Sequence, residues 1–480
     1  MTLAPPARSG ARSVLVEQRP LRNPDAGNPA FMGRRAWWLV VMNVLIPGSA
    51  QVLAGNKRLG RFGLGATLFG WVLVILAVGL AIFWRSALIT IGTNWFVLTF
   101  LQVALIFYAV LWIILTIDTL RLLRLIKLPQ ISRFATPIAA LLVGVLVVSG
   151  ALWGSFAAAA GRGALSDIFG NSGPSLPPSD GYYNILLLGA DSGHGRDSMR
   201  FDSISVVSVN AKTGAVTMIG IPRELPNAPF SEGSPMRQDY PDGFQGHADP
   251  TCGWEPWMNQ LRNAAEVCRT DDGKGLYPDA VDHGSAPGIE ATKDAAEGVL
   301  GIEIPYYVFI DMDGFADMID ALGGVKITVK ERLPEGGGPG NTNRSVDEWA
   351  TGWIEKGTQV MDGETAQWYA RSRYTTSDYD RMKRQRQLQV AILKQFTPQN
   401  VVSHFSAIAD ASGDLAKTDL PQDKLPEFFD LILKAKDQKI TRMELTPEDG
   451  VDAENPDYAA IRERVHELMH PPSPEETPES

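Results

Sequence analysis

Hydrophobic and polar positions divide this chain into two parts at about residue 160. Long charge-free stretches fill the first part, at 36–56, 62–84, 86–117 and 134–161. A helix that crosses the hydrocarbon core of a membrane needs roughly 20 apolar residues, which the last three stretches provide. The first stretch carries Asn43, Pro47 and Gly48 near its middle, where they break or kink a helix. We therefore predict a membrane region over 36–160, with three spans and a re-entrant or interfacial hairpin.

Basic residues beside these stretches set the predicted orientation. They form three clusters: Arg34 and Arg35; Lys57, Arg58 and Arg61; and Arg121, Arg124, Lys127 and Arg133. Basic clusters of this kind prefer the cytoplasm, and all three reach it if the first stretch does not cross the membrane. Four full spans would force one cluster, or the C-terminal domain, to the disfavoured side. We predict a multi-pass cell-membrane protein with a cytoplasmic N-terminus, a disordered basic cytoplasmic arm at 1–35 and an extracytoplasmic C-terminal domain.

Short strands and helices alternate beyond a Gly/Ser/Pro-rich linker predicted at 161–182. Strands are predicted at 184–190, 203–209, 216–221, 306–311 and 325–329, and helices at 257–267, 288–300, 313–322, 363–369 and 380–396. The turn at 210–214 joins two of these strands in a hairpin. Alternation of this kind predicts an α/β domain over 183–398, with helices packed against a central sheet.

Three segments depart from this alternation. The polar stretch 224–287 is too long for a simple connection, so we predict an insertion that carries the helix at 257–267. Short helices and turns follow at 399–446 as a C-terminal helical extension. The acidic, Pro-rich stretch 447–480 is predicted to be a disordered tail.

Both cysteines of the chain, Cys252 and Cys268, fall within the predicted insertion. In an oxidising compartment such a pair predicts a disulfide that staples a loop. Two unrelated reduced thiols are the alternative, which would hold for a cytoplasmic domain. A closed zinc site would need matching histidines, and His247 and His283 are weak candidates to complete one.

The segment 368–389 concentrates positive charge in a chain whose net charge is -10. Its basic residues are Arg371, Arg373, Arg381, Lys383, Arg384 and Arg386. Arginine forks match phosphate oxygens in a bidentate manner and remain charged at physiological pH. A solvated basic helix face is the alternative. Polar neighbours such as Asp378 and Gln385 favour a binding site, in which Arg381 and Gln385, four apart, share one helix face.

A second polar group lies at the ends of the first strands. Asp191 follows the strand at 184–190, Arg200 and Asp202 precede the predicted hairpin, and Arg223 follows it. A hairpin returns its two ends to the same edge of the sheet. Arginines that face carboxylates suit a pyrophosphate with Mg²⁺, which takes carboxylate and phosphate oxygens. A salt-bridge network that closes the domain is the alternative, and His194 is a weak candidate for a catalytic role.

Several of these motifs together resemble the LytR-CpsA-Psr family. They are 184–191 (NILLLGAD), 200–203 (RFDS), 221–224 (IPRE), 369–373 (YARSR), Asp378 and 381–385 (RMKRQ). The resemblance covers roughly Asn184 to Phe396 and implies a mixed central sheet flanked by helices. It also implies a membrane-anchored extracytoplasmic phosphotransferase, which moves a glycopolymer from a polyprenyl-pyrophosphate carrier onto peptidoglycan.

The resemblance also implies a role for each matching residue. Pyrophosphate binding falls to Arg200, Arg223, Arg371, Arg373, Arg381 and Gln385. The residues with an implied catalytic role are Arg200, Asp202, Arg371 and Arg373. Asp191 and Asp202 would hold Mg²⁺. Asp378 matches a further acidic position of the family's site. Phe201 and Glu224 depart from the family pattern, which usually has a small residue and Asp there. Lys383, Arg384 and Arg386 are left to surface or ion-pair roles.

Two other functions fit part of this pattern. A non-catalytic chaperone of the cell envelope would bind a polyprenyl phosphate or glycopolymer without turning it over. A membrane-bound regulator would use the arginine-rich helix on nucleic acid, since basic patches bind phosphates. The predicted orientation places that helix outside the cell, so we expect the membrane, the carrier-linked glycopolymer and peptidoglycan as partners, and no nucleic acid.

Overall fold

The structure, a computed structural model, divides into two compact units, Met1–Ala159 and Ala160–Ser480. The residues that it describes are 21–25, 27–169, 173–190, 200–247, 249, 252, 255–336, 338, 343–395, 416–436 and 438–471. Asp191 and His194, named above, lie outside them, as do residues 1–20 of the predicted arm.

Three helices of the first unit are long and apolar enough to cross a membrane. They are α4 (Lys57–Phe83), α6 (Trp95–Leu122) and α7 (Gln130–Phe169), with α7 counted over Gln130–Gly163. The stretch predicted as one span at 86–117 is divided between α5 (Arg85–Gly92) and α6, with the short turn η1 (Leu125–Lys127) after them. Within the described residues, the expected number of long apolar helices is confirmed.

The first apolar stretch forms two shorter helices, α2 (Pro29–Leu45) and α3 (Ser49–Ala54). They separate at Pro47 and Gly48, where a helix break was predicted. Gly48 has a φ of 95°, and a Cβ there would lie 2.4 Å from the backbone nitrogen of Leu64. Only glycine fits this position, because other residues disfavour positive φ and a side chain would collide with α4.

Buried polar side chains fasten α2 and α3 to α6. Arg35 donates from Nη1 to the main-chain oxygen of Leu122, 2.9 Å away, at the C-terminal end of α6. Gln51 donates from Nε2 to the main-chain oxygen of Leu115 and to Oγ1 of Thr119, at 2.8 and 2.9 Å. Because a buried polar group is costly without a partner, these bonds fix the position of the helix pair.

The linker predicted from residue 161 is wrong in its first part, because α7 continues to Phe169. The stretch 155–169 (SFAAAAGRGALSDIF) consists largely of helix-forming residues and contains no proline. The prediction took the small residues after 161 as typical of a linker. Alanine, however, has the highest helix propensity, so this stretch continues the helix.

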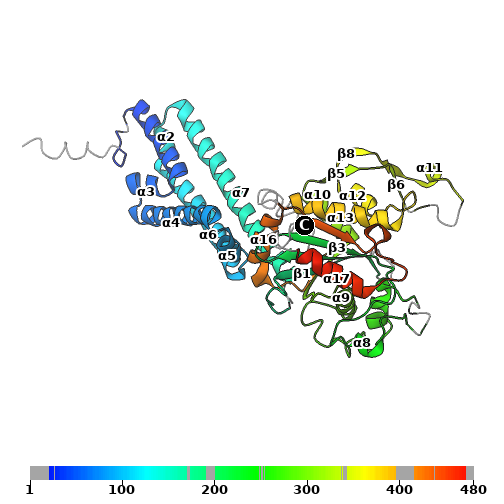
Figure 1. Cartoon of the computed structure of the whole chain (residues 1–480). Helices are drawn as coiled ribbons and strands as arrows, with labels where there is room; N and C mark the ends of the chain where they lie inside the picture. The colour runs from blue at the N-terminus through cyan, green and yellow to red at the C-terminus, as the bar shows by residue number, and fades with distance from the viewer. Residues whose placement is uncertain are drawn as a thin grey trace, which may run out of the picture. The chain divides into compact units, whose positions relative to one another are not determined.

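The second unit is built on a six-stranded mixed sheet in the order β10-β3-β2-β1-β4-β9. The strands are β1 (Tyr182–Ala190), β2 (Phe201–Asn210), β3 (Val216–Ile221), β4 (Tyr306–Asp311), β9 (Ala416–Thr418) and β10 (Thr441–Glu444). β1, β2 and β3 pair in antiparallel fashion, whereas β4 runs parallel to β1 and β10 parallel to β3. This confirms the predicted α/β fold with a mixed central sheet (Figure 1).

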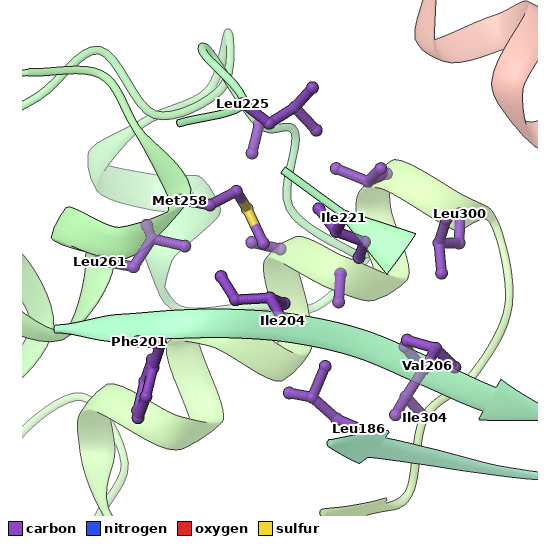
Figure 2. Packing of buried hydrophobic residues seen from close by; sticks show 14 of the residues in the cluster. Leu186, Phe201, Ile204, Val206, Ile221, Leu225, Met258, Leu261, Leu300 and Ile304 are labelled. Carbon is purple, nitrogen blue, oxygen red and sulfur yellow. The ribbon is translucent and has the colours of Figure 1, made fainter. Parts of the chain in front are cut away.

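One face of the sheet carries the main hydrophobic core. Leu186 and Leu188 of β1 point into it, together with Ile204 and Val206 of β2. Helix α9 (Pro287–Leu300) covers this face, and Figure 2 shows Leu300 and the following Ile304 beside the strand residues. The alternate residues Ile185 and Leu187 face the opposite side of the sheet, so β1 is apolar on both faces.

The insertion contributes to the same core. Leu225, Met258 and Leu261 are buried against the sheet residues (Figure 2). Its regular elements are α8 (Met236–Asp239), a 3₁₀ turn η3 (Met258–Gln260) and a π-helical turn η4 (Asn263–Val267). Cys252 and Cys268 form the predicted disulfide, with Cα atoms 5.7 Å apart. The described part of the insertion is therefore packed and cross-linked.

Helices cover the opposite face of the sheet, and two small sheets pack against these helices. The helices are α10 (Met312–Ala321), α12 (Gly363–Arg371), α13 (Asp378–Gln395) and α16 (Leu425–Ala435). Strand β5 (Val325–Val329) pairs with β8 (Gly357–Met361), and β6 (Leu333–Glu335) with β7 (Gly352–Ile354). The helix α11 (Val346–Trp349) precedes β7. The predicted strand at 325–329 exists, but in a small sheet; the sequence did not predict β6, β7 or β8.

Over the described residues after 415, the predicted C-terminal extension contains a short helix, α16, and a turn, but its two strands were not predicted, and the disordered tail is wrong over 447–471. β9 and β10 form the two edges of the main sheet, and the turns η5 (Gln422–Lys424) and η6 (Pro447–Asp449) follow them. Helix α17 (Tyr458–Met469) lies beside α9 (Figure 1) and buries Ile461, Val465 and Met469 in the main core. These three residues are spaced by four, so they share one helix face that average composition does not reveal.

Ile461→Ala should destabilise the second unit by about 2–5 kcal/mol, because it leaves a cavity in the main core. Thermal unfolding of the detergent-solubilised chain, followed by tryptophan fluorescence, measures the loss. Glu463→Ala on the exposed side of α17 is the control and should leave the transition unchanged. Equal effects of the two substitutions would show that α17 does not contribute to the core.

Candidate functional site

Helix α13 begins with an ion pair at its first turn. Nε and Nη2 of Arg381 donate to the two carboxylate oxygens of Asp378, at 2.9 and 3.1 Å. Nη1 of Arg381 donates to the main-chain oxygen of Asp202 in β2, at 3.0 Å. A carboxylate is favoured at a helix N-terminus by the helix dipole. One buried guanidinium thus joins the start of α13 to the central sheet.

Arg223, which lies two residues after the end of β3, completes this polar group. Its Nη1 lies 2.5 Å from Oδ1 of Asp202, and its Nη2 lies 2.9 Å from Oε1 of Glu224. The same Nη2 is 3.8 Å from Oδ1 of Asp378. The hairpin of β2 and β3 therefore brings Asp202 and Arg223 together, as predicted, and α13 adds Asp378 and Arg381.

The charged side chains of this group shift the pKa values of Asp378 and Arg223. Burial alone would raise the pKa of Asp378, but the hydrogen bond from Arg381 and the charges of Arg381, Arg223 and Arg373 lower it overall. Burial alone would lower the pKa of Arg223, and the nearby Asp378, Asp202 and Glu224 raise it instead. Both shifts favour the charged forms of Asp378 and Arg223.

The remaining predicted residues lie around this group. Arg373 is exposed and close enough to Asp378 to affect its pKa. Arg371 ends α12 with its guanidinium 5.5 Å from the ring centre of Trp368. Arg200 is exposed just before β2. The structure therefore brings Arg373 close to the Asp378 carboxylate.

Gln385 lies one turn after Arg381 on α13. Its Nε2 donates to the main-chain oxygen of Ala370 in α12, at 3.4 Å. Its Oε1 is buried and accepts no hydrogen bond, and Nε of Arg223 is likewise buried without an acceptor. Buried polar atoms are rarely left without partners, so these two atoms mark a place where a polar ligand would satisfy them.

Arg384 was predicted to be solvated or ion-paired, and this is wrong. Its side chain is 6% exposed and donates from Nε to the main-chain oxygen of Tyr369, at 3.0 Å, and from Nη2 to that of Ser372. Both acceptors lie at the end of α12, where carbonyl groups lack helical partners. Arg384 therefore orients the segment that carries Arg371 and Arg373. No pattern in the sequence distinguished Arg384 from the neighbouring basic residues.

Arg386 and Lys383 do form ion pairs. Nε of the fully buried Arg386 lies 3.5 Å from Oε1 of Glu444 in β10. Burial lowers the pKa of Arg386 and raises that of Glu444, and the attraction within the pair opposes both shifts. Lys383 contacts Glu448. These contacts hold α13 against the C-terminal edge of the sheet.

An apolar cavity of about 400 Å³ lies between α13 and the sheet. Its walls come from β1, β2, β3 and β4 on one side and from α10, α13 and α16 on the other. Most lining side chains are aliphatic or aromatic, as at Ile185, Val207, Ile392 and Phe428. Gln385 is among the few polar residues on its wall. The cavity therefore meets the arginine–carboxylate group along α13.

Asp378→Asn should lower the free energy of unfolding by about 1–3 kcal/mol at pH 7, because the buried Arg381 loses its charged partner. The folded pKa of Asp378 is lowered, so its contribution is present above about pH 4 and is lost as the pH falls through the folded pKa. Unfolding measured between pH 7 and pH 3 should show the variant and the wild type converging at the acid end.

The exposed Asp242→Asn is the control for this experiment and should follow the wild type at every pH. A difference between Asp378→Asn and the wild type that did not change with pH would contradict the ion pair as its source.

Comparison with known proteins gives relatives that share part of the chain. One is the polyisoprenyl-teichoic acid–peptidoglycan teichoic acid transferase TagU of Halalkalibacterium halodurans, 28% identical over 250 residues, which cover 51% of this chain and 64% of the relative. Another is biofilm regulatory protein A of Streptococcus mutans, 25% identical over 258 residues, which cover 52% of each chain. The match spans less than two thirds of the length of either relative.

Among solved structures, TagT of B. subtilis matches with a TM-score of 0.39 and 21% identity, over 63% of this chain and 96% of that one. The profile of the LytR_cpsA_psr family matches residues 165–227 and 275–469, together more than half of the chain. The matched residues include β9, β10 and α17, and the interval between them falls within the insertion. The chain belongs to the LytR_cpsA_psr family.

Proposed function

We propose that this protein is a membrane-anchored, extracytoplasmic phosphotransferase. It would move a glycopolymer from a polyprenyl-pyrophosphate carrier onto peptidoglycan during cell-wall assembly. A relative named as a polyisoprenyl-teichoic acid–peptidoglycan teichoic acid transferase supports the class of reaction. The long apolar helices of the first unit support the membrane anchor.

One observation carries the proposal: an apolar cavity and an arginine–carboxylate group share helix α13. A polyprenyl pyrophosphate has an apolar tail and a doubly charged polar head, so it needs these two environments next to each other. Gln385 lines the cavity, and Arg381 precedes it by one helical turn. The tail would occupy the cavity, and the head group would lie at Arg223, Arg373 and Arg381.

The arginines would act by binding and orienting the phosphates. Each guanidinium presents several N–H donors in a plane, which matches phosphate oxygens in a bidentate manner. Arg223 and Arg381 are held by Asp202 and Asp378 before substrate arrives, so their positions require little reorganisation. Donors fixed in advance stabilise the charge that develops on the transferred phosphoryl group.

Magnesium fits the donors that remain at this site. The Asp202 side chain is 38% exposed, and its ion pair with Arg223 uses Oδ1, so Oδ2 could bind a cation. Among the described residues, Asp202 and Asp378 do not belong to a group of three acidic or imidazole ligands. Mg²⁺ commonly takes one or two carboxylates together with substrate phosphates, so two are sufficient. When bound, it would neutralise charge on the phosphates; Asp202 would hold it, with Asp191 as the second proposed ligand.

Arg223→Ala should reduce transfer from a polyprenyl-pyrophosphate-linked glycopolymer to peptidoglycan by about 10²–10³-fold. Arg223→Lys should restore only part of the rate, because an ammonium group cannot bind in a bidentate manner. The measurement uses the detergent-solubilised chain with radiolabelled donor and purified peptidoglycan. Full activity of Arg223→Ala would overturn the assignment, whereas tight donor binding without transfer by the wild type would favour the non-catalytic chaperone.

Leu393→Trp should fill part of the cavity and weaken binding of a long-chain polyprenyl pyrophosphate by about tenfold or more. A short-chain analogue such as geranyl pyrophosphate should bind the variant and the wild type equally, because it needs less of the cavity. Lys394→Ala, on the exposed side of α13, is the matched control. Equal loss for both lipids would place the tail elsewhere.

The proposed orientation also has a direct test. A reporter enzyme that is active only outside the cytoplasm, fused after Pro471, should be active in intact cells, since we expect the second unit outside the membrane. The same reporter fused after Asn56 should be inactive. The reverse pattern would overturn the proposed topology.

A further inference from the structure

A tight turn precedes the first strand of the second unit. Ser179 and Tyr182 exchange both main-chain hydrogen bonds, at 2.9 and 2.8 Å, around Asp180 and Gly181. Asp180 has a φ of 47° and Gly181 a φ of 78°. An Asp-Gly pair with positive φ at both positions is typical of a type I′ turn. The turn leaves the Asp180 side chain exposed beside the end of α17.

Helix α17 presents two histidines to this turn. His466 and His470 are four residues apart, with His470 as the C-cap, and their ring centres lie 4.7 Å apart. The segment reads His466-Glu467-Leu468-Met469-His470. An H-E-x-x-H segment on a helix places both imidazoles on one face, which is a known arrangement for zinc binding. The motif also has a third candidate ligand here, because Nε2 of His470 lies 2.7 Å from Oδ2 of Asp180.

We propose that Asp180, His466 and His470 form a zinc site, separate from the arginine–carboxylate group. One ligand atom from each of the three residues lies within 4.8 Å of the others. Two imidazoles and one carboxylate form a donor set that Zn²⁺ readily accepts and that Mg²⁺, which prefers oxygen ligands, does not. The ligands of a tetrahedral zinc ion lie about 3.3 Å apart, so small rotations of these surface side chains would complete the site.

The surroundings hold His470 in place for this role. The ring of Tyr182 packs against its imidazole edge to face, with ring centres 5.6 Å apart. The hydroxyl group of Tyr182 donates to the main-chain oxygen of Met469. These contacts position the last turn of α17 and orient the His470 imidazole. Groups next to a metal ligand commonly fix the orientation of its ring. A water molecule would take the fourth position, because Asp180 and His466 are exposed.

Zinc at this position would clamp the two ends of the second unit together. Asp180 precedes β1, and the histidines end α17, whose other face is buried in the main core. Binding to the folded form alone stabilises it. We assign the site a structural role, because its three ligands connect a turn to a helix that already packs on the core. Glu467, the acidic residue of the H-E-x-x-H segment, is exposed.

The test uses the detergent-solubilised full chain, stripped of metal with a chelator that is then removed. Titration with ZnCl₂ should give one bound zinc ion per chain, and zinc at a hundred times its Kd should raise the Tm by about 5 °C. MgCl₂ at the same concentration should leave the Tm unchanged. Bound zinc is counted by elemental analysis after gel filtration.

Variants assign the binding to these residues. His466→Ala and His470→Ala should each weaken zinc binding at least tenfold, and Asp180→Asn should weaken it by a smaller factor. His283→Ala, an exposed histidine elsewhere in the unit, and Glu467→Gln should bind zinc as the wild type does. The Tm of each variant without zinc, equal to that of the wild type, shows that it folds.

Two outcomes would overturn the proposal. One is unchanged zinc affinity in the His466→Ala and His470→Ala variants, which would assign the metal to adventitious sites. The other is an equal loss in His283→Ala. Loss of zinc with transfer activity retained would leave the proposed phosphotransferase intact, so the two proposals fail independently.

Discussion

The ion pair between Asp378 and Arg381 determines where α13 sits on the sheet. A guanidinium that is almost fully buried requires partners, and Arg381 finds them in the Asp378 carboxylate and in the main-chain oxygen of Asp202. Since α13 also forms one wall of the apolar cavity, the same contact fixes the cavity and the charged group beside it. If the pair were broken, a buried charge would remain without compensation, and both features would lose their common support.

The basic residues of α13 divide into different roles according to their neighbours. Arg384 satisfies the terminal carbonyl groups of α12, and Arg386 pairs with Glu444 at an edge of the sheet. Burial makes each of these contacts obligatory, because an unpaired charge in a low-dielectric interior is costly. The residues left for a substrate are Arg223, Arg373 and Arg381 of the arginine–carboxylate group; Arg373 is exposed, whereas Arg223 and Arg381 are held by Asp202 and Asp378. The positive charge of the helix is largely structural, and a smaller part of it is available for phosphate.

The two ends of the second unit meet in three dimensions. β9 and β10 close the sheet at opposite edges, α17 packs on α9, and the turn at Asp180 reaches the last turn of α17. The insertion adds to the same core and is cross-linked by Cys252 and Cys268. This arrangement explains why residues 447–471 of the acidic segment are folded: the apolar residues Ile461, Val465 and Met469 fall on one helix face. The His466-x₃-His470 spacing was readable in the sequence, but its third partner lies 286 positions earlier than His466.

Local patterns determined much of this protein from the sequence. Apolar length predicted the long helices, Pro47 and Gly48 predicted the break, and period-two and turn signals predicted the β2–β3 hairpin that joins Asp202 to Arg223. Separated motifs predicted the family. Tertiary structure alone decided that Arg384 is buried and that β9 and β10 complete the sheet. These outcomes depend on contacts between residues far apart in the chain.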